Sequence, residues 1–370
     1  GRRHGLVRLL RCARKVPRRA PAFKPPRITS SRPSRTHIFI VDGTLSRLTD
    51  GEETNAGLLY RLLTEVGPTV DQTFGYHPGV QGEGWLKWLR IAAGQGINAA
   101  ICQGYATLAS RYEPGDKVML LGYSRGAYAV RSIAGWIGRV GLLKRELATE
   151  RRIARSFRHY QKMRPNGATR SFTARFCHAD VPIEMVGVWD TVRALGLPYP
   201  VLNRIVPMVT EFHDHRIGNT VARAFQALAI DETRVAYQPV KWSPGADWPG
   251  QMEQVWFPGA HADVGGHVHA NPAARGLSNI PLVWMLERVE ACGVNLPPGW
   301  RDRFPTDPLA PAIGNWRGGA RLFFFRNRRI VEQAPYESVH PSVDARIDGR
   351  RYRPKAEISG QVRDVSVATS

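Results

Sequence analysis

A serine flanked by two glycines is the pattern in this sequence that could do the most chemistry. Ser124 lies at the centre of residues 122–126, which read Gly-Tyr-Ser-Arg-Gly, after an apolar run at 118–121 and before a stretch with helical spacing at 127–140. A tight strand-to-helix turn of this kind lifts a serine hydroxyl clear of the backbone, where a base and a substrate carbonyl can both reach it. Side chains at Gly122 and Gly126 would collide with the neighbouring strand and helix. We therefore expect Ser124 to be a nucleophile at such a turn.

A serine nucleophile needs a base, and the base needs a carboxylate that orients it. Asp190 follows the apolar residues 187–189, and His261 lies in a glycine-rich segment just after a predicted strand at residues 254–258. The order Ser, Asp, His is the order in which these groups occur when the serine stands at a strand-to-helix turn. Because the carboxyl ends of parallel strands converge on one crevice, we expect Asp190 and His261 to meet Ser124 there.

Three further residues could fill the same roles, and they remain alternatives at the level of sequence. Asp231 follows the apolar segment 225–230, and Asp263 comes two residues after His261. His340, within residues 338–343, is a second candidate base. We favour Asp190 and His261 because each stands at the end of a predicted strand and because their order along the chain fits.

The negative charge that forms on the substrate carbonyl oxygen must be stabilised by hydrogen-bond donors. We expect one donor to be the backbone N–H of Arg125, the residue after the serine. The other is expected from Gly43 and Thr44, which follow the first predicted strand. Asp-Gly-Thr at 42–44 is also found in haloacid-dehalogenase phosphatases, but their attacking aspartate would stand at Ile40, which cannot attack phosphorus.

The elements that must position these residues alternate along the chain. The predicted strands are residues 37–41, 70–76, 118–122, 182–189 and 254–258, and the predicted helices are residues 57–66, 97–111 and 127–140. Residues 321–325 fit either a strand or a helix. This alternation predicts an α/β fold, with a mostly parallel sheet flanked by helices. We expect a single α/β-hydrolase domain at residues 36–370, with cap insertions.

The charge of the chain is unevenly distributed. Residues 1–35 contain twelve Lys and Arg and no Asp or Glu, which is more than half of the net charge of +21. They are also rich in Pro and Ser, so we expect a disordered basic arm. A solvated tail is the simplest interpretation, and electrostatic attachment to an anionic membrane surface or to nucleic acid is the alternative. No motif in the sequence indicates a specific nucleic-acid partner.

Cysteine usage and hydropathy bear on the cellular setting. The four cysteines lie far apart and form no CxxC pair, which predicts neither a disulfide framework nor a zinc site. No apolar run approaches the roughly 18–20 residues that span a bilayer, and the arm has too few apolar residues for a secretory signal. We expect a cytoplasmic protein that needs no metal or cofactor, with export by a secretion system left open.

Taken together, the motifs resemble those of the type VI secretion phospholipase-effector-like α/β-hydrolases. The resemblance rests on residues 42–44, 122–127, 187–192 and 256–266, and on connecting segments at 212–214 and 227–232. It implies a lipid-esterase site built from Ser124, Asp190 and His261. The chain has Ser46 shortly after the Asp-Gly-Thr, where the family often has an asparagine.

The predicted function is therefore that of a serine hydrolase that cleaves carboxylic esters, with a lipid or another ester as its substrate. Residues 192–212 are apolar and broken by prolines, so they could form a lid over an acyl-binding groove or a packed cap over the sheet. Two functional alternatives stay open. One is a hydrolase-like binding module without turnover, and the other is a soluble small-molecule esterase.

Overall fold

The computed structural model describes residues 32–44, 46–79, 96–162, 165–192, 217–268, 271–314, 326–332 and 334–358. Its centre is a seven-stranded sheet in the order β10-β8-β7-β6-β3-β1-β2, in which every neighbouring pair is parallel. The strands are β1 (Thr36–Val41), β2 (Gln72–His77), β3 (Lys117–Tyr123), β6 (Ile183–Trp189), β7 (Arg223–Ala229), β8 (Gln251–Phe257) and β10 (Glu337–Val339). All seven strands therefore end at the same edge of the sheet.

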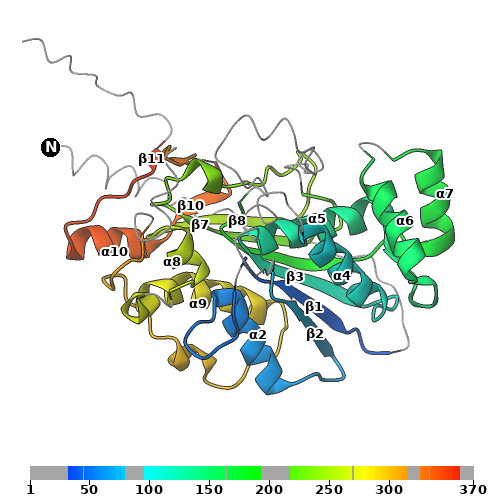
Figure 1. Ribbon diagram of the computed structural model, residues 1–370, viewed down its shortest axis with the longest axis horizontal. Helices are drawn as coiled ribbons and strands as arrows, with labels where there is room; N and C mark the ends of the chain where they lie inside the picture. The colour runs from blue at the N-terminus through cyan, green and yellow to red at the C-terminus, as the bar shows by residue number, and fades with distance from the viewer. Residues whose placement is uncertain are drawn as a thin grey trace, which may run out of the picture.

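Helices cover both faces of this sheet (Figure 1). Two pack on one face, α4 (Ile97–Ala109) and α5 (Arg125–Val140), and two on the other, α2 (Asn55–Val66) and α9 (Arg275–Ala291). Strand β3 illustrates why the sheet needs both layers. Its Val118 and Leu120 join the core under α4 and α5, whereas Met119 and Leu121 join the core under α2 and α9. A run of apolar residues without alternation is what a strand buried on both faces requires.

The remaining elements extend the two ends of the molecule. At the edge formed by β8 and β10, helix α10 (Pro341–Gly349) packs in a third, smaller core. Near it lies a small parallel pair, β9 (Ile330–Val331) and β11 (Glu357–Ile358), and Ala356 N donates to Ile230 O just after β7. After α5 come β4 (Leu142–Leu143) and β5 (Cys177–His178), which pair antiparallel.

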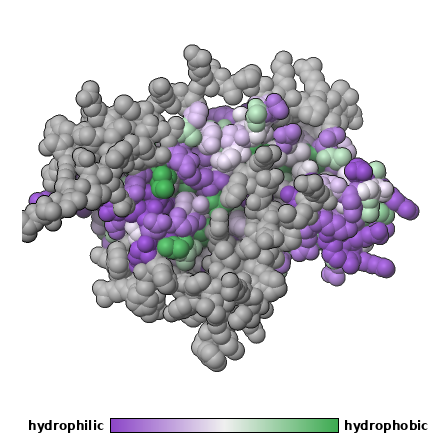
Figure 2. Space-filling view, turned by 90° about the horizontal axis from the view of Figure 1, so that it is seen from above, coloured by the Kyte–Doolittle hydropathy of each residue, from purple (hydrophilic) through white to green (hydrophobic). Residues whose placement is uncertain are grey.

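Helices α6 (Glu150–Tyr160) and α7 (Gly167–Phe176) form a basic lobe at the end of the molecule away from Ser124. They follow the carboxyl end of α5, whose amino end carries Ser124, and they project from the sheet in Figure 1. The exposed arginines of the two helices are Arg151, Arg155, Arg158, Arg170 and Arg175. Figure 2 shows hydrophilic residues gathered over this end. The lobe is therefore a charged surface remote from the serine.

The predicted α/β fold with its parallel sheet and flanking helices is confirmed. The five predicted strands and three predicted helices all form, with ends shifted by a few residues. Strands β7 and β10 were not predicted: β7 is rich in alanine, which disfavours strands, and β10 has three residues. Residues 1–31 of the arm, most of the apolar segment 192–212, and residues 321–325 lie outside the described residues. The single domain at 36–370 stays a prediction.

Candidate active site

Ser124 stands at a corner that few residues can occupy. It joins β3 to α5 with φ 57° and ψ −118°, a conformation that residues with a side chain rarely adopt. A Cβ at Gly122 would lie 2.6 Å from the carbonyl oxygen of Gly126 in the helix, and a Cβ at Gly126 would lie 2.1 Å from that of Val41 at the end of β1. Both contacts are impossible for real atoms, so the two glycines are needed for the turn. Ser124 thus has the backbone geometry of a nucleophile elbow.

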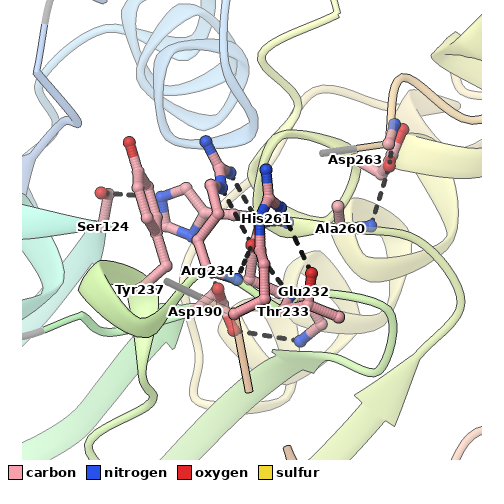
Figure 3. A network of polar contacts seen from close by, with 12 residues as sticks. Ser124, Asp190, Glu232, Thr233, Arg234, Tyr237, Ala260, His261 and Asp263 are labelled. Atoms are coloured by element: carbon pink, nitrogen blue, oxygen red, sulfur yellow. Dashed lines mark hydrogen bonds and ion pairs between the residues drawn. The ribbon is translucent and has the colours of Figure 1, made fainter. Parts of the chain in front are cut away.

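The three residues predicted from their order along the chain lie in one hydrogen-bonded row (Figure 3). The Oγ atom of Ser124 is 2.8 Å from Nε2 of His261, and Nδ1 of His261 is 2.6 Å from Oδ2 of Asp190. Ser124 follows β3, Asp190 follows β6 and His261 opens the short helix α8 (His261–Gly265) after β8. Parallel strands thus bring together residues that are 71 and 137 positions apart.

His261 is held on several sides. Its backbone N–H donates to Oε2 of Glu232 at 3.2 Å. The ring of Tyr123 stacks on the imidazole with centroids 4.9 Å apart, and the ring of Tyr237 meets it edge-on at 4.8 Å. Only 5% of His261 is exposed. These contacts hold the imidazole in the plane that reaches both Ser124 and Asp190.

Burial and neighbouring charges set the protonation of the row. Burial lowers the pKa of His261 below its ordinary value, although the hydrogen bond and charge of Asp190 oppose the shift. Burial alone would raise the pKa of Asp190, but the charge of Arg329 and the hydrogen bonds from His261 and Arg329 outweigh it and hold this pKa well below its usual range. At neutral pH the row therefore contains a neutral imidazole and an ionised carboxylate, which is the state a general base requires.

Glu232 and Arg234 form a second ion pair beside the imidazole. Arg234 donates from Nε and Nη2 to the two oxygens of Glu232, at 2.9 and 2.7 Å. Burial would raise the pKa of Glu232, but the hydrogen bonds and charge of Arg234 lower it to about 2. Glu232 is thus an ionised acceptor for the backbone of His261.

The alternative acids lie around the same loop without reaching the imidazole. Asp231 accepts from Gly259 N at 2.9 Å, from Tyr352 Oη at 2.8 Å and from Lys355 N at 3.0 Å. Asp263 accepts from the backbone N–H of Ala260, Ile313 and Gly314. Both carboxylates therefore fasten the segment that carries His261. The structure brings Asp190, and neither of these, to Nδ1.

His340, the alternative base, has a different set of contacts. Its Nδ1 accepts from the backbone N–H of Ser342 at 3.2 Å, which caps α10, and its ring stacks on Phe257 with centroids 4.7 Å apart. Burial lowers its pKa to about 4. His340 is thus tied to the start of α10.

The loop after β1 is organised by the fully buried carboxylate of Asp42. This carboxylate accepts from Gly43 N at 2.6 Å, Ser46 Oγ at 2.9 Å, Thr54 Oγ1 at 2.7 Å and Tyr76 Oη at 2.7 Å. Burial nevertheless raises its pKa. Because the N–H of Gly43 is directed to Asp42, it is already used within the loop.

Thr44 is the other residue of that loop that was predicted to supply a donor. Its hydroxyl oxygen is buried and has no hydrogen-bond partner within the described part of the chain. Arg125, whose backbone N–H was the other predicted donor, is the first residue of α5. The backbone N–H of Arg125 thus follows the corner that carries Ser124, whereas the N–H of Gly43 is engaged within its own loop.

Sequence reasoning missed the residues that support the row. Arg329 forms an ion pair with Asp190 at 2.5 Å, and Glu232 and Tyr237 contact His261. Glu232 directly follows Asp231, but the strand that precedes it, β7, was not predicted, so its place at a strand end was not visible in the sequence. Arg329 is one of four arginines in residues 321–330, and nothing in its neighbourhood distinguishes it.

In the described ranges, no group of three or more His, Cys, Asp or Glu side chains could hold a metal ion. None of the helices described is both long enough and apolar enough to cross a bilayer.

The parallel sheet, its two helical layers and the serine at the β3–α5 corner define an α/β-hydrolase fold. Residues 35–288 match the family described as the catalytic domain of type VI secretion system, Tle1-like phospholipase effectors. The chain belongs to this family, and the resemblance inferred from its motifs is confirmed. Membership supports a hydrolase of the lipase or phospholipase kind.

Three individual proteins that are similar to this chain have low sequence identity to it. The uncharacterized protein YEL023C of Saccharomyces cerevisiae is 28% identical over 233 residues, which are 56% of this chain and 32% of that protein. A solved structure of the Tle1 effector bound to the VgrG spike of the type VI secretion system has 19% identity and a TM-score of 0.39, over 67% of this chain and 52% of that one. An uncharacterized protein from Pseudomonas aeruginosa has 18% identity and a TM-score of 0.41, over 74% and 49%. The chain thus spans well under two thirds of each of these proteins.

Proposed function

We propose that this chain is a serine hydrolase that cleaves carboxylic esters of lipids, with Ser124 as nucleophile, His261 as base and Asp190 as orienting acid. The observation that carries the proposal is the unbroken hydrogen-bonded row from Ser124 Oγ through both nitrogens of His261 to Asp190. Membership in a family of phospholipase-effector catalytic domains supports lipids as the substrate class.

The reaction follows from the positions of these groups. Ser124 Oγ attacks the ester carbonyl carbon while its proton passes to Nε2 of His261. Donors at Thr44 and the backbone N–H of Arg125 stabilise the charge on the carbonyl oxygen. The imidazolium then protonates the departing alcohol and leaves the acyl group on Ser124. Water, deprotonated by His261, attacks the acyl carbon, and the imidazolium returns this proton to Ser124 Oγ as the bond between Oγ and the acyl carbon breaks and the acid is released.

A fluorophosphonate probe tests whether the serine is activated, because such probes label only nucleophilic serines. Ser124→Ala should abolish labelling and reduce ester hydrolysis by on the order of 10³-fold or more. Ser132→Ala is the matched control, since Ser132 is buried in the same helix α5 and donates to Tyr128 O. Undiminished labelling of Ser124→Ala would mean that the nucleophile lies elsewhere. A wild-type protein that is neither labelled nor active on esters would be a binding module.

The lipid part of the proposal needs its own comparison. Vesicles of anionic phospholipid should be hydrolysed faster than a soluble short-chain ester. Residues 1–31 contain ten Lys and Arg, each worth roughly 1 kcal/mol of attraction near an anionic surface. Their removal should weaken vesicle binding and leave turnover of the soluble ester unchanged. Equal rates on both substrates, with binding that ignores salt, would leave a soluble esterase.

The truncation in this experiment has a structural limit. Arg32 Nη2 and the backbone N–H of Arg35 both donate to Asp116, at 2.8 and 2.9 Å. These bonds tie the chain before β1 to the turn before β3. Cutting after residue 31 removes most of the basic arm and keeps them.

A further inference from the structure

The carboxylate of Asp190 contacts two side chains that carry or can take a positive charge, His261 and Arg329. Arg329 makes two of these contacts and His261 makes one. Its Oδ2 atom lies 2.6 Å from Nδ1 of His261 and 2.9 Å from Nη2 of Arg329. Its Oδ1 atom accepts from Nη1 of Arg329 at 2.5 Å and from the backbone N–H of Ala229 at 3.0 Å. The guanidinium therefore spans both carboxylate oxygens, in the two-pronged geometry that fixes a carboxylate most rigidly.

The same guanidinium reaches the walls of the site. Arg329 donates from Nη1 to Ala229 O at 3.0 Å and from Nη2 to Tyr237 O at 2.5 Å. Ala229 ends β7, and Tyr237 belongs to the short 3₁₀ turn η4 (Val235–Tyr237), whose aromatic ring meets His261. One side chain thus joins the proposed acid, a strand end and the ring beside the base.

The ion pair between Arg329 and Asp190 is buried, so stabilisation of the fold alone is a weak explanation for it. Arg329 is 1% exposed and Asp190 is fully buried. Removing two charges from water costs about as much as their attraction returns, and apolar pairs of similar size are often at least as stable. A buried pair that touches a proposed catalytic carboxylate at both oxygens suggests a role in orientation and charge.

We propose that Arg329 is a positioning residue of the hydrolase, which locks the Asp190 carboxylate toward His261 and offsets its charge. The inference rests on the proposed function, because it assigns Arg329 a part in the same reaction. Its partial neutralisation of Asp190 limits how strongly the carboxylate favours the protonated imidazole. Arg329 therefore keeps the base unprotonated to a lower pH than Asp190 alone would allow.

Among the other charged groups around His261, Glu232 raises its pKa and Arg234 lowers it. Glu232 meets the backbone of His261 and is paired with Arg234 through two hydrogen bonds, so their charges largely cancel. Tyr123 and Tyr237 contact the imidazole through their rings. Arg329 is the cation on the carboxylate that faces Nδ1. Without it, the proton affinity of the coupled Asp190–His261 pair would rise.

The test is the pH profile of kcat/KM on a soluble ester, together with the rate of fluorophosphonate labelling. Arg329→Gln removes the charge and keeps hydrogen-bond donors. The acidic limb of the kcat/KM profile of this variant should therefore move to higher pH by about one unit. Its rate on the high-pH plateau should also fall by on the order of 10-fold or more, because the carboxylate is less well held. Arg329→Lys keeps the charge and loses the fork. It should therefore show the lower plateau with the limb close to that of the wild type.

Arg328→Gln is the matched control. Arg328 is the preceding residue, its side chain is 64% exposed, and its charged contact is Glu357 at 3.9 Å. The same substitution there should leave both limb and plateau unchanged. In an Asp190→Asn background, Arg329→Gln should produce no further shift, because the carboxylate on which the guanidinium acts is gone.

The outcomes separate this inference from the proposed function. Wild-type protein that is inert to the probe and to esters at every pH counts against the hydrolase itself. An active wild type whose Arg329→Gln and Arg329→Lys variants both keep its limb and plateau overturns the role of Arg329. If Arg329→Gln does not fold, Arg329→Lys decides alone. If the high-pH plateau of kcat/KM in Arg329→Lys equals that of the wild type, the proposal is overturned. A plateau lowered on the order of 10-fold supports it.

Discussion

Ser124 and Asp190 share a feature of the backbone that no other non-glycine residue in the described chain has. Both have a positive φ, 57° and 43° respectively. They follow neighbouring strands, and Ser124 N donates at 3.0 Å to the carbonyl oxygen of Trp189, the residue before Asp190. Such conformations cost on the order of 1–3 kcal/mol each and persist where surrounding contacts determine them. The strain thus coincides with two of the three proposed catalytic residues.

Relief of the strain at Ser124 should be measurable in urea unfolding. Ser124→Gly should be more stable than Ser124→Ala by about 1 kcal/mol, because glycine takes a positive φ without steric cost. Both variants lack the hydroxyl and should be inactive. The order should reverse at Ser132 inside α5, where glycine is about 1 kcal/mol worse than alanine. Equal stability of the two Ser124 variants would argue against strain at the corner.

Substitution of each of the two candidate bases, His261 and His340, should affect activity and stability differently. His261→Ala should lower turnover about as much as Ser124→Ala, because the two residues act as one unit. His340→Ala should keep most of the activity. It should lose about 1 kcal/mol of unfolding free energy, because it removes the cap of α10. Ester kinetics and thermal unfolding of both variants check this, and the reverse pattern would make His340 the base.

The pH dependence of kcat/KM should report the protonation of His261. Burial lowers the pKa of His261 from its ordinary value of 6.5. Protonated imidazole cannot accept the serine proton, so activity should rise with pH through a midpoint below 6.5 and then level off. A midpoint above 7 would mean that the charge of Asp190 outweighs burial.

Substitution at the corner glycines should be costly. Gly126→Ala would drive a methyl group to 2.1 Å from the carbonyl oxygen of Val41. The strand end or the helix must then move, and we expect a loss of about 2–4 kcal/mol together with most of the activity. Gly167→Ala in α7 is the control, since an added Cβ there meets nothing within 4 Å. A Gly126→Ala variant with unchanged stability and activity would mean that the backbone at this corner adjusts more easily than these contacts suggest.

Much of the fold and the row of three residues could be predicted because the signals are local. A run such as residues 118–121, followed by glycine, serine and glycine, indicates a buried strand and a tight corner without any knowledge of distant contacts. Parallel strands then bring Asp190 and His261 to the same edge as Ser124. Chain order and strand ends were therefore enough to choose them over Asp231 and His340.

The parts that could not be predicted depend on pairing across long stretches of chain. Strand β7 is rich in alanine, and it is a strand because β6 and β8 pair with it on both sides. The contact between Arg329 and Asp190 joins positions 139 apart. The use of Gly43 N by the Asp42 carboxylate depends on how the loop after β1 closes. No pattern of residue types encodes these contacts.

The order of strands in the sheet has a consequence for how the protein is made. After β3, each further strand joins outside the one before it: β6 beside β3, then β7, β8 and β10. A chain that emerges from the ribosome can therefore add strands one at a time to an edge that already exists. Ser124 is in place once the β3–α5 corner forms, whereas its proposed base, His261, is added only with the residues after β8, and Arg329 later still. A partly synthesised chain would thus carry the proposed nucleophile without its proposed base, and the proposed hydrolytic activity would come late in synthesis.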